Sequence, residues 1–373
     1  MIETNFKHTD IGLIPHDWEV RIIKDFADIT TGSQNTQDRI DNGEYPFFVR
    51  SSKVERINKY IFDTEGVITA GDGVGTGKIY HYINGKFGLH QRCYLVYNFE
   101  RVSAKYFYRI FGQHFYDRVQ GMTAKSSVDS VRMEMIADMP IPLPPTLAEQ
   151  EKIANALSKI DQLINDLGAL IEKKKAIKQG TMQDLLTAKR RLKGFTGEWT
   201  SKQIIEIVGK IKRGQSLQSK DYKKGDIPVV AGGKQYAGFH NVANHHGRTI
   251  TISGSGANAG YVSFHANPIF ATDCSVIDDK GNFDLLFIYY VLQQRQNDIY
   301  KLQSGGAQPH FYPKNIEDIV SIFPPTLAEQ NAIANILSSM DTEITNLKQK
   351  RDKYIAIKQG MMQNLLTGKI RLI

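Results

Sequence analysis

The stretch Pro144-Pro145-Thr146-Leu147-Ala148-Glu149-Gln150 occurs a second time in the chain, as Pro324 to Gln330. The similarity continues from Pro144 to Lys193 and from Pro324 to Ile373, where roughly 29 of 50 positions match without a gap. Chance does not produce such a match. The sequence therefore contains an internal duplication, and the rest of the chain is interpreted from it.

Each copy of the duplicated stretch has the pattern of one long helix. Thr146 and Glu149, like Thr326 and Glu329, form an S/T-x-x-E capping box behind two prolines. Apolar residues then recur alternately four and three positions apart, which predicts a coiled-coil seam. The residues predicted to pair the helices are Ile153, Leu157, Ile160, Ile164, Leu167, Ile171, Ile333, Leu337, Met340, Ile344, Leu347 and Tyr354.

A helix of about 40 residues is roughly 60 Å long, and its narrow apolar stripe needs a partner. The other copy is the obvious partner, packed antiparallel. The alternative, in which each helix buries its stripe against its own domain, stays open at this point. The predicted fold class is α+β, with two similar globular α/β domains separated by two long antiparallel coiled-coil helices in a pseudo-twofold arrangement. The predicted bounds are 1–143 for the first domain, 144–193 for the first helix, 194–323 for the second domain and 324–373 for the second helix.

The second globular domain begins with a sequence similar to the beginning of the first. Trp199 and Gly214 correspond to Trp18 and Gly32, so the duplication includes the globular domains. We predict an apolar-faced helix in each, over 103–119 and 284–301. We also predict strands around a type I′ hairpin turn at Asn84-Gly85.

The composition is that of an ordinary globular chain. It has 373 residues, of which 41% are hydrophobic and 23% charged. No apolar run approaches the length of a membrane span, and no signal peptide is visible, so we expect no membrane association. The isolated cysteines Cys93 and Cys274 suit a reducing cytoplasm, which is the expected location.

The net charge of +8 and the pI near 9.1 indicate a polyanionic partner. The excess of basic residues is largest on the predicted helices. The runs Lys173-Lys174-Lys175 and Lys189-Arg190-Arg191 could face nucleic acid, or they could be solvated faces that complement the helix C-terminal dipole. Both interpretations stay open.

Several kinds of chemistry are excluded by spacing. A phosphate-binding loop ending at Lys78 would need glycine at position 72 and serine or threonine at 79, where the chain has Asp72 and Ile79. The glycines at 71–77 and 253–256 are therefore predicted to form turns between strands. Neighbouring histidines such as His245 and His246 have no cysteine or carboxylate at ligand spacing, and no nucleophile elbow or helical H-E-x-x-H is found. We expect no catalysis, no metal and no cofactor in this chain.

The chain resembles the specificity subunits of type I restriction-modification systems over essentially its whole length. The resemblance is carried by Ile11 to Trp18, by Ile141 to Gln150, by the repeat at Pro324 to Gln330, and by the Lys-Gln-Gly-x-Met-Gln-x-Leu-Leu-Thr that closes both helices. Together these motifs are specific, whereas any one alone would be weak.

The resemblance implies two target recognition domains that each read one half of a bipartite sequence in double-stranded DNA. It also implies helices that set the gap and dock two methyltransferase (modification) subunits, to which restriction (motor and nuclease) subunits are added. S-adenosylmethionine, ATP and Mg are then expected in those partners. The alternative from another class is a coiled-coil scaffold or adaptor without DNA recognition. The recognition half of a fused nuclease and methyltransferase would need catalytic motifs that this chain lacks.

Two related domains at the ends of a rigid spacer also form a geometry for reading two separated half-sites on one duplex. We expect base or phosphate contacts from polar loops on one rim of each domain. The residues predicted to contact DNA are Arg50, Lys53, Thr76, Lys78, Arg92, Lys125, Arg213, Gln215, Lys234, Gln235, Asn258, Thr272 and Gln308.

Overall fold

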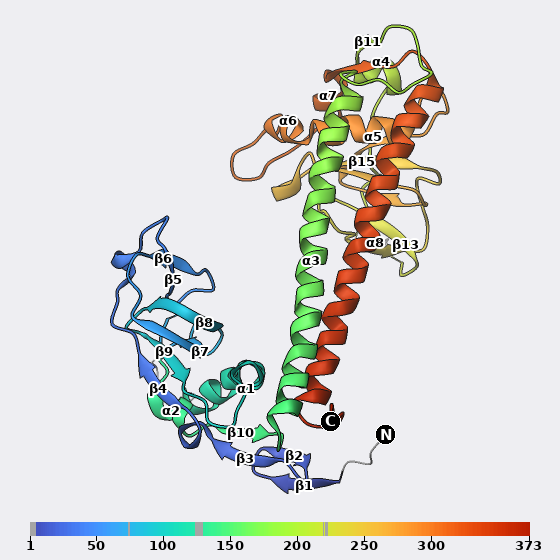
Figure 1. Ribbon diagram of the computed structural model, residues 1–373. Helices are drawn as coiled ribbons and strands as arrows, with labels where there is room; N and C mark the ends of the chain where they lie inside the picture. Colours follow the sequence, from blue (N-terminus) through green and yellow to red (C-terminus); the bar gives the residue numbers. More distant parts are fainter. Residues whose placement is uncertain (1–4, 74, 124–129, 219, 221–222) are drawn as a thin grey trace. The chain divides into compact units, whose positions relative to one another are not determined.

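The computed structural model describes residues 5–73, 75–123, 130–218, 220 and 223–373. The chain forms two compact units (Figure 1). Unit 1 comprises 1–166 and 350–373, and unit 2 comprises 167–349. Each unit holds one globular domain together with parts of both long helices, α3 (Leu147–Leu186) and α8 (Leu327–Leu365). The four segments predicted from the sequence, two domains and two helices, stay a prediction in their exact bounds.

The domain of unit 1 is built on a six-stranded sheet in the order β4-β9-β7-β8-β5-β6. All pairs are antiparallel except β5 and β8, which run parallel. Helix α1 packs against β7 and β8 (Figure 1). The bounds are β1 Phe6–Thr9, β2 Gly12–Pro15, β3 Glu19–Ile22, β4 Asp28–Thr31, β5 Tyr45–Phe48, β6 Glu55–Ile57, β7 Phe62–Ala70, β8 Tyr80–Leu89, β9 Cys93–Tyr97, α1 Ala104–Thr123, α2 Met133–Ala137 and β10 Pro140–Leu143.

The hairpin turn predicted at Asn84-Gly85 is wrong. Both residues lie inside β8, where Asn84 pairs with Glu65 and Gly85 pairs with Thr64 of β7. The chain reverses earlier, in the glycine-rich segment between β7 and β8. A continuous partner strand therefore overrides the local turn preference of the two residues.

The domain of unit 2 repeats this sheet in two pieces, β12-β18-β15-β16 and β14-β13-β17. The strand equivalent to β8 is split into β16 and β17, and Pro268 lies between the two pieces. Proline has no N–H to donate to a ladder, which accounts for the break. The bounds are β11 Thr200–Gln203, α4 Ile204–Val208, β12 Lys212–Arg213, β13 Ile227–Val230, β14 Gly238–His240, β15 Thr249–Ser253, β16 Val262–His265, β17 Phe270–Ala271, β18 Cys274–Asp278, α5 Leu285–Gln294, α6 Gln296–Lys301, α7 Pro313–Glu317 and β19 Val320–Phe323.

The helix predicted over 284–301 is interrupted. It forms α5 and α6 with Arg295 between them, so one predicted helix is two in the structure. Asp284 caps α5, because its carboxylate accepts the backbone N–H of Phe287 at 2.6 Å.

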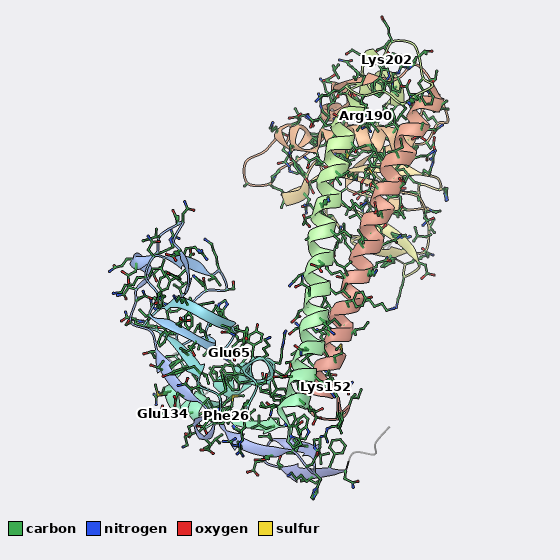
Figure 2. All side chains as sticks on the ribbon, in the orientation of Figure 1. Phe26, Glu65, Glu134, Lys152, Arg190 and Lys202 are labelled. Carbon is green, nitrogen blue, oxygen red and sulfur yellow. The ribbon has the colours of Figure 1, made fainter. Side chains whose placement is uncertain are left out.

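Each unit has its own apolar core, in which the globular domain and both long helices take part. Phe26, labelled in Figure 2, lies in the core of unit 1 with its ring centroid 6.0 Å from that of Phe107. Ile153 and Leu157 of α3 join the same core, together with Leu365 of α8. The first turns of each long helix thus pack on the domain that precedes it, and its last turns join the core of the other unit. The coiled-coil seam of the middle turns stays a prediction.

The predicted seam residues are buried or half-buried throughout. Within unit 2 the two helices run antiparallel, because Lys174 pairs with Glu343 and Lys178 with Asp341. The Lys178 and Asp341 contact is 2.6 Å long, and Tyr290 of α5 donates to the same carboxylate at 2.8 Å. Part of the basic run on α3 is therefore neutralised by α8.

Unit 1 repeats this polar contact with the helices exchanged. Lys358 of α8 approaches Asp161 of α3 at 2.6 Å, and Arg109 of α1 pairs with the same carboxylate. Burial opposes the charge of Asp161, but the bonds from Lys358 and Arg109 outweigh it and lower the pKa of this carboxyl.

The predicted capping boxes are only partly made. The backbone N–H of Glu149 donates to the Thr146 hydroxyl at 3.2 Å, as expected. The carboxylate of Glu149, however, binds Arg371 at 2.5 and 2.8 Å, and Arg371 also binds Asp17. In unit 2 the carboxylate equivalent to Glu149 is likewise taken by an arginine and by a tryptophan N–H. The glutamate carboxylate of each capping box therefore binds an arginine that is distant in the sequence.

Candidate nucleic-acid interface

In unit 1 three chain segments meet at one end of the sheet. The backbone N–H of Gly71, just after β7, donates to the carbonyl of Arg92 at 2.8 Å, and the N–H of Val131 donates to the carbonyl of Gly71 at 2.7 Å. A side-chain carbon at Gly71 would lie 2.8 Å from the Arg92 oxygen, so this approach requires glycine. Asp72 is thereby held at the rim, next to the turn that leads into β9.

Unit 2 makes the corresponding contact at the same place in its fold. The N–H of Gly254, just after β15, donates to the carbonyl of Asp273 at 3.0 Å. Ser255 therefore occupies the position of Asp72, and Asp273 occupies that of Arg92. The backbone frame is shared, whereas the side chains on it differ in charge.

Rim cluster 1 consists of Arg50, Asp72 and Arg92. Arg50 Nη1 lies 2.7 Å from Asp72 Oδ1, and Arg92 Nη1 lies 2.6 Å from Asp72 Oδ2. The guanidinium side chains of Arg50 and Arg92 are 40% and 60% exposed. One carboxylate thus binds two arginines whose side chains remain partly exposed. Burial opposes the charge of Asp72, but the two arginines outweigh it and lower its pKa.

His90 lies beneath rim cluster 1 and is only 4% exposed. Its Nδ1 accepts the backbone N–H of Arg92 at 3.0 Å. Burial and the nearby Arg50 lower the pKa of His90, so the imidazole is neutral near pH 7. With two guanidinium groups and one carboxylate, rim cluster 1 carries a net positive charge.

Rim cluster 2 consists of Arg213, Ser255 and Asp273. Arg213 Nη2 lies 3.5 Å from Asp273 Oδ1, and the Ser255 hydroxyl donates to Asp273 Oδ2. Arg213 also lies over the ring of Tyr312, 5.8 Å from its centroid. With one guanidinium and one carboxylate, rim cluster 2 is neutral overall.

The other predicted contact residues of unit 1 have mixed surroundings. Lys53 is exposed and pairs with Glu55, while Lys78 lies over the Tyr116 ring at 4.9 Å. Thr76 is 8% exposed and its hydroxyl donates to the Gly73 carbonyl at 2.6 Å. Lys125 lies outside the described residues.

The remaining predicted contact residues of unit 2 lie in loops around rim cluster 2. Thr272 is adjacent to Asp273, and its backbone N–H is bound to Val230. Lys234 lies over the Tyr261 ring at 5.2 Å, and Asn258 is half-buried in the turn after β15. Gln215, Gln235 and Gln308 are exposed. A role in DNA contact stays a prediction for each residue in this set.

The central carboxylates, Asp72 and Asp273, and the aromatic neighbour Tyr312 were not predicted from the sequence. A signal for Asp72 was present, because a charged residue stood between two glycines at the end of a strand. Nothing local indicated that Arg50 would reach it, since the two residues are brought together by the parallel pairing of β5 with β8.

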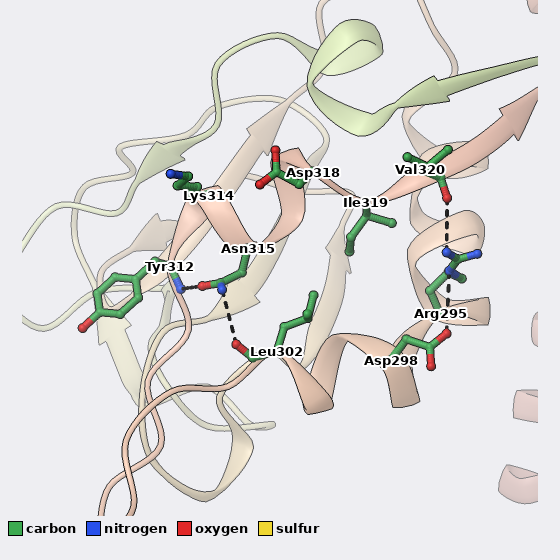
Figure 3. A pocket seen from close by; sticks show the side chains of 9 residues that line it. All are labelled: Arg295, Asp298, Leu302, Tyr312, Lys314, Asn315, Asp318, Ile319 and Val320. Atoms are coloured by element: carbon green, nitrogen blue, oxygen red, sulfur yellow. Dashed lines mark hydrogen bonds and ion pairs between the residues drawn. The ribbon is translucent and has the colours of Figure 1, made fainter.

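A hollow of about 640 Å³ lies beside α6 and α7 in unit 2 (Figure 3). Leu302, Tyr312 and Val320 line it and are 41%, 43% and 46% exposed. Arg295 donates to the Val320 carbonyl at 3.2 Å and lies 3.8 Å from Asp298, as the dashed lines in Figure 3 show. Tyr312 thus lines this hollow, and its ring also contacts Arg213 of rim cluster 2.

Within the described ranges, no group of three or more histidine, cysteine, aspartate or glutamate side chains could hold a metal ion. Burial raises the pKa of the Cys93 and Cys274 thiols to about 12, which leaves both as thiols near pH 7. None of the helices in the described residues combines the length and apolarity that a membrane crossing needs.

The chain is similar to known specificity subunits of type I restriction enzymes. The chain is 26% identical over 417 residues to the MjaVIII type I restriction enzyme specificity subunit of Methanocaldococcus jannaschii, covering 99% of this chain and 97% of that protein. It is 26% identical over 240 residues to the EcoDI type I restriction enzyme specificity subunit of Escherichia coli, covering 62% and 50% of the two chains.

The fold is also found among solved structures. The type I restriction-modification S subunit from M. genitalium matches with a TM-score of 0.75 at 19% identity, over 98% of this chain and 97% of that one. The family model described as type I restriction modification DNA specificity domain matches twice, at residues 15–179 and 196–355. The chain therefore belongs to the type I restriction-modification DNA specificity family, and it is the DNA specificity component of such a system.

Proposed function

We propose that each unit reads one half of a bipartite DNA sequence, with rim clusters 1 and 2 at the two reading surfaces. The observation that carries this proposal is the shared frame at the sheet ends, which presents differently charged side chains at equivalent positions, Asp72 and Ser255, Arg92 and Asp273. A duplicated frame with exchanged side chains suits two different half-sites on one duplex.

We further propose that α3 and α8 fix the number of unread base pairs between the half-sites and dock two methyltransferase subunits. Both helices are continuous: α3 has 40 residues and α8 has 39. The duplication of the helices provides two equivalent docking surfaces. Restriction subunits would join this core. Methylation and cleavage would be carried out by those partners, with their S-adenosylmethionine, ATP and Mg, and this chain would be non-catalytic and work in the cytoplasm.

The test is methylated-base sequencing of DNA from a host that carries this chain together with its methyltransferase partner. The expected result is a bipartite motif with an unread spacer of fixed length. Methylation that lacks any such motif, or that persists when this chain is deleted, would contradict the proposal. A scaffold without DNA recognition would leave duplex binding by the complex unchanged when the rim clusters are substituted.

A further inference from the structure

Rim clusters 1 and 2 share a backbone frame but offer DNA opposite kinds of group. In rim cluster 1, Asp72 engages one Nη of Arg50 and one of Arg92. Within the described part of the chain, neither guanidinium has another side-chain partner. The remaining N–H groups of each planar fork are therefore available, and the fork is held by a fixed acceptor. Guanine presents two acceptors, O6 and N7, in the major groove, and a bidentate arginine is their common partner.

The position of Arg92 is occupied in unit 2 by an acceptor, Asp273. Its carboxylate receives the Ser255 hydroxyl on Oδ2 and lies 3.5 Å from Arg213 on Oδ1, and the side chain remains 36% exposed. A carboxylate has about four lone-pair sites, so two such partners leave acceptor capacity. Cytosine presents a single donor in the major groove, its N4 amino group, and a carboxylate is the matching acceptor.

Building on the proposed function, we propose that the half-site read by unit 1 contains a guanine recognised by Arg92 with Asp72 as its positioning residue, and that the half-site read by unit 2 contains a cytosine recognised by Asp273. Asp72 does not touch the base. It holds Arg92 in the orientation that permits two parallel hydrogen bonds, which reduces the conformational freedom lost on binding.

The experiment uses the complete complex with its methyltransferase partner and determines the methylated motif for each variant. Arg92→Ala is expected to make one guanine position of one half-site degenerate, with a preference lowered by about 5- to 140-fold, while the other half-site and the spacer stay unchanged. Arg92→Lys keeps the charge but presents no planar fork, so it is expected to relax the same position. Asp72→Asn keeps the shape and is expected to relax that position partially.

Asp273→Asn supplies the second arm. An amide favours adenine, where it makes two bonds, so a cytosine of the other half-site is expected to give way to adenine. Lys24→Ala is the matched control, because Lys24 forms an exposed ion pair with Asp138, far along the chain from the rim residues. This control should leave the motif unchanged.

Three outcomes would overturn the inference. Arg92→Lys could leave the parental motif unchanged, which would show that this position needs no planar fork. Arg92→Ala could weaken methylation of all sequences equally, which would make Arg92 a phosphate contact. Asp72→Asn could leave the motif and the degree of methylation unchanged, which would remove its positioning role. A parental complex with no bipartite motif would instead contradict the proposed function itself. A misfolded Asp72→Asn chain is recognised by loss of all methylation, and the Arg92 variants then decide.

Discussion

Breaking the ion pair between Arg371 and Glu149 is expected to cost unit 1 a large part of its stability. The side chains of Glu149 and Arg371 are 3% and 10% exposed, and two hydrogen bonds join them. Arg371→Ala would leave a buried carboxylate without its cation, which typically costs about 3–5 kcal/mol. At about 2–4 °C for each kcal/mol in a unit of this size, the melting temperature of unit 1 should fall by about 6–20 °C.

The chain provides its own reporters for this measurement. Its two tryptophans lie in different units, Trp18 in unit 1 and Trp199 in unit 2. In a Trp199→Phe background, the fluorescence of Trp18 follows the unfolding of unit 1 alone. The matched control is Arg351→Ala, because among the described residues Arg351 pairs only with its neighbour Asp352, and the two side chains are 36% and 63% exposed. This change should alter stability by less than about 0.5 kcal/mol.

The expected loss comes from the unpaired charge of Glu149, and a second variant isolates this cause. Glu149→Gln combined with Arg371→Ala replaces the carboxylate by a neutral amide, so the double variant should be more stable than Arg371→Ala alone. Equal stabilities would show that the loss comes from the packing of Arg371 over the Trp18 ring, 5.7 Å from its centroid. A loss below about 1 kcal/mol for the single variant would refute the ion-pair argument.

Three further outcomes are expected. Four residues inserted after Leu167 and four after Leu347 add roughly 6 Å to each helix, so methylated-base sequencing should show unchanged half-sites and a spacer longer by about one to two base pairs. Leu157→Ala and Leu337→Ala remove fully buried side chains and should each cost about 2–5 kcal/mol, the first in unit 1 and the second in unit 2, as read from the tryptophan of that unit in denaturant. Burial lowers the pKa of His265 to about 4, below its value of 6.5 in the unfolded chain, so the unfolded state binds more protons between these values. Unit 2 should therefore lose about 3 kcal/mol as the pH falls from 6.5 to 4, and His265→Gln should flatten that dependence in denaturant titrations at a series of pH values.

The long helices could be predicted from the sequence because their signals are local. Proline, capping threonine and the four-three spacing all lie within one continuous segment, and the helices begin at Leu147 and Leu327, directly after the predicted caps. The carboxylates of Glu149 and Glu329 were misjudged, because local pattern assigns them to the cap whereas the fold supplies arginines from far along the chain.

The recognition surfaces were harder to predict from the sequence. Arg50 and Arg92 could be named as polar loop residues, but their common partner Asp72 could not, since only sheet order brings the three together. At Asn84-Gly85, too, a contact with a distant segment decides the structure. Its turn preference is strong in isolation, and the pairing with β7 decides against it.

The way unit 1 is assembled from distant segments has a consequence for synthesis on the ribosome. Glu149 and Arg371 are separated by 222 residues, so at about 5–20 residues per second roughly 10–40 s pass between their synthesis. All of unit 2, residues 167–349, is translated within that interval. Unit 1 therefore begins synthesis first but is completed last, and Glu149 has no arginine partner until the segment 350–373 is synthesised. A nascent chain that stops before this segment would contain every residue of unit 2 but would lack part of unit 1. Cellular quality control could recognise such a chain by its incomplete unit 1.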